Sequence, residues 1–474
     1  MFLATLHASS EGERGESAQA EADRALEKVS EEHGGRPEPT TPPKQPAARR
    51  PPPPGARRVL NPLPVPPEER SCPTCGAERV CVTHETTEVI DLLPAEVIVR
   101  LDRREILACA TCEGEAERAP MGDKVVAGGA YGSRLVADLV VGKYWDGLPL
   151  NRQGQQLERL GLSMPSSSMA DQITWATDLL RPVWGHLLAS VLAADVMHID
   201  GTGLPVRDKE SPKGIVLGTL WVFVGDRSSA AYLYTSTGKQ LGQRPGEVGP
   251  LAFLARRRGF VVADASNVFD ASYASGERIE IGCNMHGRRY FVKALEANDA
   301  RAAVAVTAFR ALYDVEADVV DADAERRLAE RQRRSRPVYD ELVRWCRTYR
   351  PVEPPSSLLG KAIQYLLNHR VALMRFLDDG RLPIDNGIVE RLRRRLAVGR
   401  RNYLFAGSHA GGERAAIAYS VLASCALCEI NPVDYLADEL PRLARGAFTR
   451  SALEAWTPAA WKAAHSNPAP PVPA

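Results

Sequence analysis

The chain contains three acidic residues whose positions suit a metal-dependent catalytic centre. Asp200 and Asp264 each follow a short apolar run of the kind that forms a buried strand. Glu390 lies in a segment whose pattern predicts the start of a helix. Carboxylates gathered at buried strand ends repel one another unless a cation joins them, and Mg²⁺ is a usual cation. The pattern predicts that Asp200, Asp264 and Glu390 are catalytic and bind two Mg²⁺ ions.

Each of these carboxylates also has an ordinary structural explanation. Asp200 and Asp264 could each cap the turn that follows it. Glu390 could form a surface pair with Arg394, one helical turn further on. Two strand-end aspartates and a distant helical glutamate are together a more specific pattern than any one of them.

Four cysteines form two Cys-x-x-Cys pairs with 33 residues between them. Two short chelate loops bring four thiolates to tetrahedral reach, which is what structural Zn²⁺ requires. Reduced free thiols are the plain alternative, and Cys81 or His84 could supply the fourth ligand instead. The predicted ligands of one structural Zn²⁺ are Cys72, Cys75, Cys109 and Cys112.

Changes in composition and hydrophobic period divide the chain into several parts. Residues 1–68 are rich in proline and poor in apolar residues, which is typical of disorder. Helical stripes, then strands, then further helical stripes follow, which predicts an α/β fold. The predicted parts are the Pro-rich tail (1–68), a small zinc-binding domain (69–118), a helical, helix-turn-helix-like DNA-binding domain (119–194), the first part of a catalytic core (195–286), a helical insertion (287–378), the rest of the core with the Glu390 helix (379–445) and a C-terminal tail (446–474).

The net charge of +1 gives the chain no overall basic character, so any surface for DNA must be local. The densest basic cluster follows Glu390, where arginines could contact phosphates near a reacting bond. Two more arginines follow Cys283 and His286, a pair that could hold metal but is expected to be structural. The predicted DNA-binding residues are Arg288, Arg289, Asn386, Arg391, Arg394, Arg400 and Arg401.

Two residues in this region keep more than one interpretation. Asn386, one turn before Glu390, could orient that carboxylate or touch DNA, whereas Asp385 is expected to cap the helix. Phe405 could stack on a splayed base, but packing in the core is the favoured expectation.

Several features bear on where the protein works. No uncharged apolar stretch is long enough to span a bilayer, and the N-terminus lacks the pattern of a signal peptide. Nine cysteines in a chain of this length do not suggest a secreted disulfide scaffold. These features predict a cytoplasmic protein.

Four segments carry a resemblance to a known family. The segments 382–391 and 398–408, followed by Gly411-Gly412, closely resemble the C-terminal catalytic block of the insertion sequence 66 family of DDE transposases. Residues 283–291 are similar to the family's Cys-x-x-His-x-Arg-Arg segment, and 198–202 to its first-Asp motif. The likeness runs from about residue 70 to 440, although Gly201 stands where the family usually has an acidic residue.

The resemblance implies a prokaryotic, nucleoid-associated transposase with a ribonuclease H-like catalytic core. It implies binding to terminal inverted repeats and target DNA, assembly as a homo-oligomer, and small accessory proteins of the same element. The predicted function is Mg²⁺-dependent phosphodiester cleavage and strand transfer. Two alternatives remain open: a domesticated or inactive DNA-binding derivative, and a metal-dependent DNA nuclease without strand transfer.

Overall fold

The computed structural model describes most of the chain after residue 95. The described residues are 60, 70, 74–78, 81, 95–107, 117–119, 125–126, 129–226, 228–236, 249–265, 267–446 and 450–466. The chain forms two compact units, residues 35–98 and the remainder. Of the predicted Pro-rich tail (1–68), only Leu60 is described. His84 and three of the four predicted zinc ligands also lie outside the described residues. Cys75 and Cys81 are described, and both are exposed.

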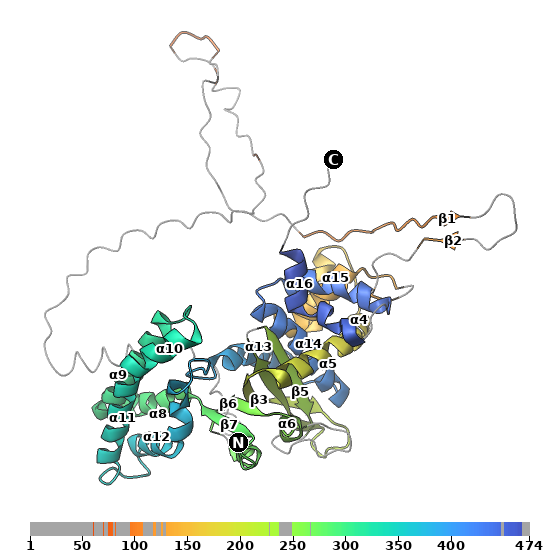
Figure 1. Cartoon of the computed structure of the whole chain (residues 1–474). Coiled ribbons are helices and arrows are strands. Elements are labelled where there is room, and N and C mark those ends of the chain that lie inside the picture. Colours follow the sequence, from red (N-terminus) through yellow and green to blue (C-terminus); the bar gives the residue numbers. More distant parts are fainter. Residues whose placement is uncertain are drawn as a thin grey trace. The chain divides into compact units, whose positions relative to one another are not determined.

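A five-stranded mixed sheet forms the centre of the larger unit (Figure 1). Its order is β5-β4-β3-β6-β7, with β3 and β4 antiparallel and β3, β6 and β7 parallel. The apolar runs before Asp200 and Asp264 form strands as predicted, and the sheet consists of β3 (Val196–Arg207), β4 (Ile215–Gly225), β5 (Ser229–Thr235), β6 (Gly259–Ala263) and β7 (Arg278–Gly282). The sequence thus identified a mixed α/β protein correctly.

One strand is longer than predicted, and this moves a candidate residue. β3 continues for 12 residues because it pairs with β4 from Met197 to Arg207. Gly201, Gly203 and Pro205 are poor strand formers, so this continuation could not be predicted from local residue types. Asp200 therefore lies within a central strand, not at a strand end.

Helices pack against both faces of the sheet and share one hydrophobic core with it. The helices that contribute are α2 (Ser133–Tyr144), α4 (Ser166–Leu179), α5 (Arg181–Ala193), α6 (Pro250–Leu254), α13 (Gly387–Tyr403), α14 (His409–Leu427) and α15 (Pro432–Ala444). α14 is buried nearly all round, and its Ser420 and Ser424 hydroxyls accept hydrogen bonds from β5 backbone N–H groups. These bonds satisfy groups that an edge strand would otherwise expose.

The predicted helical domain at 119–194 shares this core with the sheet. α3 (Leu150–Arg159) and α4 are separated by Gly161, whose φ is +85°, as the helix-turn-helix outline requires. Apolar residues of α2, α4 and α5 nevertheless pack with those of β3, β4 and β5. At the predicted boundary, residue 194, the chain thus changes from helix to strand, and both parts pack in one hydrophobic core.

A second core lies beside β6 and β7 and is built by the predicted helical insertion. The helices that contribute to it are α8 (Asn284–Glu296), α9 (Ala303–Asp318), α11 (Arg336–Tyr349) and α12 (Leu358–Met374). Between α9 and α11 lie α10 (Ala324–Glu330) and the π-helical η5 (Arg331–Ser335). Arg331 is 1% exposed, pairs with Glu316 at 2.6 Å and donates to the carbonyls of Phe376 and Leu382. This arginine ties three segments together, since its charge is paired inside the core.

The C-terminal segment differs from the predicted tail. Residues 450–466 form η7 (Arg450–Trp456) and α16 (Pro458–His465). The Tyr435 hydroxyl donates to the Trp456 carbonyl at 2.6 Å, and Trp461 Nε1 donates to Asp438 at 2.9 Å. Two tryptophans anchor this segment to α15, an effect that composition alone did not reveal.

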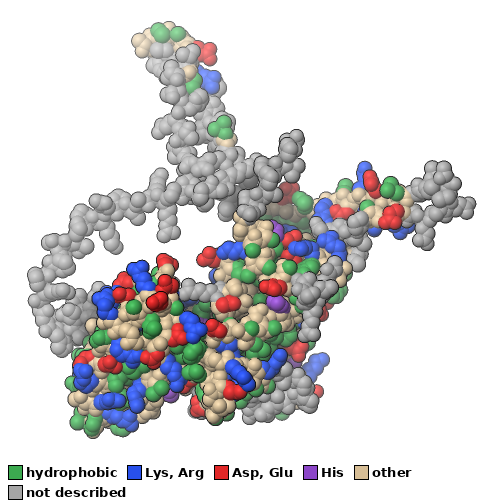
Figure 2. Space-filling view, viewed as in Figure 1, with side chains coloured by type: hydrophobic (Ala, Val, Ile, Leu, Met, Phe, Trp, Pro, Cys, Tyr) green, Lys and Arg blue, Asp and Glu red, His purple; other side chains and the backbone are tan. Residues whose placement is uncertain are grey.

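The surface of the described residues carries no strong charge asymmetry on the visible face. Figure 2 shows Lys and Arg side chains interspersed with Asp and Glu, in keeping with the net charge of +1. No helix among the described residues combines the length and apolarity that crossing a membrane would need.

Glu439 gives a stability prediction that depends on pH. It is 1% exposed, and burial raises its pKa to about 7 despite the nearby Arg442. The folded state therefore binds this proton more tightly than the unfolded state. Its stabilising effect is present below pH 4.5 and is lost as pH rises through about 7.

We expect Glu439→Gln to remove this loss, since glutamine keeps an acceptor for Arg442 without the buried charge. Urea unfolding of variant and wild type should agree near pH 4.5. By pH 8 the variant should be more stable by about 2–3 kcal/mol. A constant difference between pH 5 and pH 8 would contradict the prediction.

Candidate active site

Asp200 lies in β3, between β4 and β6, and is 8% exposed. Its carboxylate accepts a hydrogen bond from the Gly201 N–H at 2.7 Å and pairs with Arg393 at 3.0 Å. Burial raises its pKa to about 7, Arg393 opposes that shift, and Asp264 and Glu390 add to it. The three acidic residues therefore lie near enough to act on one another electrostatically.

Asp264 and Glu390 reach this region from two other elements. Asp264 directly follows β6, the parallel neighbour of β3, as the apolar run before it predicted. Glu390 lies in the first turn of α13 (Gly387–Tyr403), also as predicted. Within the described residues, no hydrogen bond or ion pair engages the Asp264 carboxylate.

The three carboxylates do not form a closed metal cage. In the part of the chain that the structure describes, no three His, Cys, Asp or Glu side chains come close enough to hold one ion. Arginine side chains pair with two of them instead. Arg393 pairs with Asp200, and Arg289 lies 3.5 Å from Glu390. The imidazole of His286 also lies 3.5 Å from Glu390. The two arginines partly neutralise charges that would otherwise be buried without partners.

Asn386 fixes the start of α13 against the central strand. Its side chain is 1% exposed and donates to the Ile199 carbonyl at 2.9 Å. Its oxygen lies 2.9 Å from His198 Nδ1, and its backbone N–H points to Cys283 Sγ at 3.3 Å. Burial lowers the pKa of His198 to about 4, so that imidazole is neutral at pH 7 and can donate to Asn386.

This geometry corrects one predicted DNA contact and separates the two interpretations of Asn386. Since the side chain is enclosed and both its polar atoms are engaged by protein, it is not available to DNA in this conformation. The backbone carbonyl of Asn386 accepts a hydrogen bond from the Glu390 N–H at 3.3 Å. Asp385 accepts from the Gly387 N–H at 2.8 Å, close to the capping role expected for it.

The predicted arginines divide into exposed and enclosed groups. Arg391 and Arg401 are exposed, and Arg394 is half-buried. Arg288 is 6% exposed, which removes it from the surface, and Arg400 donates to the Gly203 carbonyl. Arg289 is directed to Glu390 instead of to solvent. Neighbours of a helical arginine decide its exposure, so sequence alone could not sort the cluster.

Arg393 is the site residue that the sequence analysis missed. It lies three residues after Glu390, on the same side of α13, where i and i+3 side chains are neighbours. That spacing was the available signal. The Asp200 partner could not be read from it, because β3 is almost 200 residues away.

Cys283 and His286 are structural neighbours of the site. Cys283 is fully buried at the N-cap of α8, and burial raises the pKa of its thiol. Burial and Arg289 lower the pKa of His286 to about 4, so it is neutral at pH 7. The expected structural role agrees with this placement.

Gly201 shows how the chain accommodates its departure from the family pattern. Gly201 faces Trp221 across the β3–β4 pair, and a Cβ there would lie 2.6 Å from the indole ring. Trp221 Nε1 donates to Thr235 Oγ1 at 3.0 Å, which holds the ring in place. The ring occupies the space that a side chain at 201 would need.

We expect Gly201→Ala to destabilise the protein by about 1–3 kcal/mol through this overlap. Gly203→Ala is the matched control, because its Cβ would meet only the flexible Leu217 side chain at 3.0 Å. In a Trp221→Leu background the cost at 201 should largely disappear. Chemical denaturation of the double-mutant cycle measures this coupling, and additive losses would contradict it.

Phe405 is another residue whose environment was predicted wrongly. It is 38% exposed, and the preceding Leu404 is 65% exposed. By contrast, the Tyr403 hydroxyl bonds to that of Tyr419 at 3.0 Å. The helix ends between them, which turns Phe405 away from the core.

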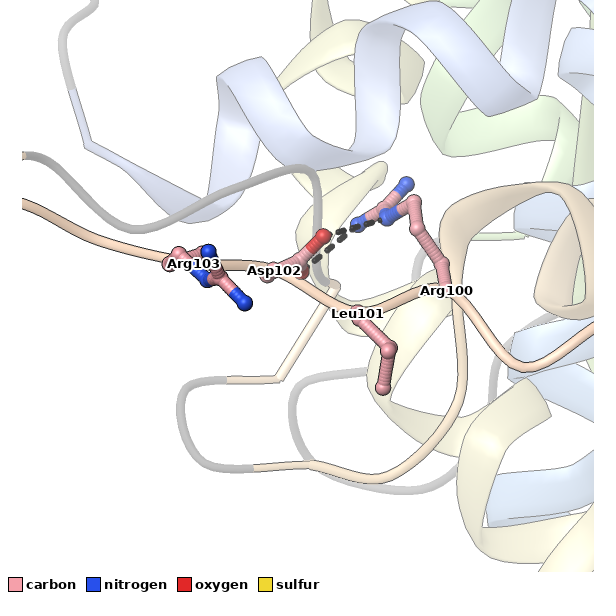
Figure 3. A pocket seen from close by; sticks show the side chains of 4 residues that line it. All are labelled: Arg100, Leu101, Asp102 and Arg103. Carbon is pink, nitrogen blue, oxygen red and sulfur yellow. Dashed lines mark hydrogen bonds and ion pairs between the residues drawn. The ribbon is translucent and has the colours of Figure 1, made fainter.

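A shallow surface hollow elsewhere carries no comparable chemistry. It is lined by Arg100, Leu101, Asp102 and Arg103 (Figure 3). Arg100 and Asp102 face each other there and form an exposed ion pair of 2.7 Å. Such a pair contributes little and marks no site.

Comparison with known proteins identifies the family of this chain. Residues 128–414 match the model of the family described as Transposase IS66 family, and residues 69–113 match the zinc-finger binding domain of transposase IS66. The chain belongs to the IS66 family of transposases.

Two relatives are uncharacterized proteins of Sinorhizobium fredii (strain NBRC 101917 / NGR234). One, y4hP, is 30% identical over 83% of this chain and 74% of its own length. The other, y4jD, is 30% identical over 84% of this chain and 80% of its own length. The similarity therefore covers most of this chain and most of each relative.

Proposed function

We propose that this chain is a DDE-type transposase that binds terminal inverted repeats and catalyses Mg²⁺-dependent DNA cleavage and strand transfer. The observation that carries the proposal is that Asp264 and Glu390 act electrostatically on the buried Asp200 in a chain of the IS66 family. The mixed sheet supports a ribonuclease H-like core, with one acidic residue on its first strand and another after its fourth. In this proposal, Glu390 is the third catalytic carboxylate.

The donor set fits Mg²⁺. Carboxylate oxygens are the ligands that this ion prefers. Glu390 Oε1 is buried without a hydrogen-bond partner, and Asp264 has no partner among the described residues. When bound, Mg²⁺ supplies activation of the attacking oxygen and stabilisation of the leaving oxygen. Asp200, Asp264 and Glu390 are the residues that would hold it.

Other residues of the chain prepare the site. Asn386 fixes the Glu390 helix against β3, and burial of the region keeps bulk water from the carboxylates. Arg393 and Arg289 pair with Asp200 and Glu390, and we propose that they would turn to DNA phosphates when Mg²⁺ is bound. Exposed Arg391 and Arg401, with Arg394, would position the DNA backbone.

A cleavage assay with the wild-type protein tests this function. Labelled duplexes taken from both flanks of the gene, where inverted repeats are expected, are incubated with Mg²⁺ or with EDTA. Mg²⁺-dependent nicks at the repeat end, followed by joining of pre-cleaved ends to a second DNA, support the transposase. Cleavage without joining supports the nuclease, and binding without cleavage supports the inactive derivative. Sizing of the DNA complex tests the proposed homo-oligomer and its accessory proteins.

We also propose one structural Zn²⁺ held by Cys72, Cys75, Cys109 and Cys112, as the zinc-finger match at 69–113 supports. β1 (Ile106–Leu107) and β2 (Glu117–Arg118) form an antiparallel pair on either side of the second cysteine pair. Cys72→Ser should lower bound zinc, measured by mass spectrometry, from one ion per chain to nearly none and weaken DNA binding.

Cys81→Ser is the matched control for this zinc prediction. It should retain the ion if the two Cys-x-x-Cys pairs supply all four ligands. Zinc retained in Cys72→Ser, or lost in Cys81→Ser, would contradict the assignment.

A further inference from the structure

The end of α13 contains a backbone conformation that a leucine rarely adopts. Leu404 has φ +63° and ψ −45°, and the Phe405 N–H donates to the Tyr403 carbonyl at 2.7 Å. These values describe a γ-turn of the strained kind. The other non-glycine residues with positive φ in the described chain are polar: Asp226, Asn298 and Glu429. A bulky apolar residue at such a position therefore needs an explanation.

Hydrogen bonds on both sides impose the turn. The Leu404 N–H donates to the Arg400 carbonyl at 3.0 Å, completing the helix. Beyond the turn, the Ala406 N–H donates to Pro205 at 2.9 Å, and the Arg207 N–H donates to Ala406 at 2.8 Å. Since helix and strand fix both ends, the strain is held by the fold. Strain of this kind is commonly kept at functional positions.

The turn presents an apolar pair beside a strongly basic helix. Leu404 is 65% exposed and Phe405 is 38% exposed. α13 carries six arginines against one acidic residue, Glu390, although the chain as a whole is only +1. Apolar side chains that wedge between or stack on bases, next to arginines for phosphates, are a recurrent design for DNA. The charge complementarity favours DNA over a second protein surface.

The position of the pair relative to the carboxylates gives a distance along the DNA. Leu404 lies 14 residues after Glu390 on a continuous helix, about 21 Å at 1.5 Å per residue. For DNA that follows the axis of α13, this span corresponds to about six nucleotides, because one strand advances about 3.4 Å per nucleotide. The turn is thus outside the catalytic site but within reach of the same DNA.

We propose that Leu404 and Phe405 form a wedge that unstacks one base step about six nucleotides from the cleaved phosphate. This proposal rests on the proposed function. The wedge would kink the DNA and bring the reacting end into the site.

The test uses a duplex with the inverted repeat beside the gene, carrying 2-aminopurine at successive positions. Wild type should raise its fluorescence at one step about six nucleotides from the cut. Leu404→Gly with Phe405→Ala should abolish this rise and weaken binding about 10-fold. Val398→Ala, which truncates another exposed apolar residue of α13, should keep both. Leu404→Gly alone should melt no lower than wild type, because glycine accepts positive φ.

The outcomes separate this proposal from the function on which it rests. Binding and cleavage by wild type without a local fluorescence rise, or with a rise that the double variant retains, overturns the wedge alone. Failure of wild type to bind the duplex overturns both. A DNA-free dimer that dissociates in the double variant, with the fluorescence rise unchanged, assigns the pair to a protein contact instead.

Discussion

Asp200→Asn should abolish Mg²⁺-dependent cleavage while leaving DNA binding intact. Asparagine preserves the size of the side chain and an oxygen for the Gly201 N–H, but it removes the charge that would hold Mg²⁺. Metal catalysis contributes several kcal/mol, so the rate should fall by about 1,000-fold or more. Single-turnover cleavage of labelled repeat ends measures the rate, and gel shift measures binding.

A stability measurement separates this loss from misfolding. Because burial disfavours the Asp200 charge, metal-free Asp200→Asn should unfold at a temperature no lower than wild type at pH 8. Asp195→Asn is the matched control: its side chain is 78% exposed and pairs with Arg381 at the surface. It should cleave at the wild-type rate. An Asp200→Asn protein that folds and cleaves within 10-fold of wild type would end the proposed mechanism.

Asn386→Ala should be the most damaging change outside the three carboxylates. It leaves His198 Nδ1 and the Ile199 carbonyl without their partner in a buried region. Unsatisfied buried polar groups cost about 1–3 kcal/mol each, so we expect a loss of about 2–5 kcal/mol in unfolding free energy. It also frees the first turn of α13, where Glu390 lies. A displacement of about 1 Å can lower the rate about 100-fold.

Asn431→Ala is the control. It tests whether the loss of another asparagine hydrogen bond lowers the cleavage rate as Asn386→Ala does. Asn431 caps α15 by accepting from the Val433 N–H at 3.0 Å, far from the carboxylates in sequence. Its loss should cost about 1 kcal/mol and leave cleavage unchanged. If the two variants lose cleavage in proportion to their stability, Asn386 has no positioning role.

Some of the candidate site could be read directly from the sequence. Asp264 follows β6 and Glu390 opens α13 as predicted, because an apolar run and a helix start are local patterns. Asp200 was named as a candidate but was expected at the end of a strand, whereas it lies within β3. The glycines and proline after it suggest a turn, yet pairing with β4 carries β3 through them to Arg207.

The tertiary structure decided which side chains are available. Arg288 and Asn386 looked suited to DNA but are buried, while Phe405 looked suited to the core but is partly exposed. The Arg393–Asp200 pair joins residues almost 200 positions apart. The sequence by itself determined the elements and the chemical types they carry, because those depend on neighbouring residues. Burial, pairing and exposure depend on which elements pack together, so only the folded chain set them.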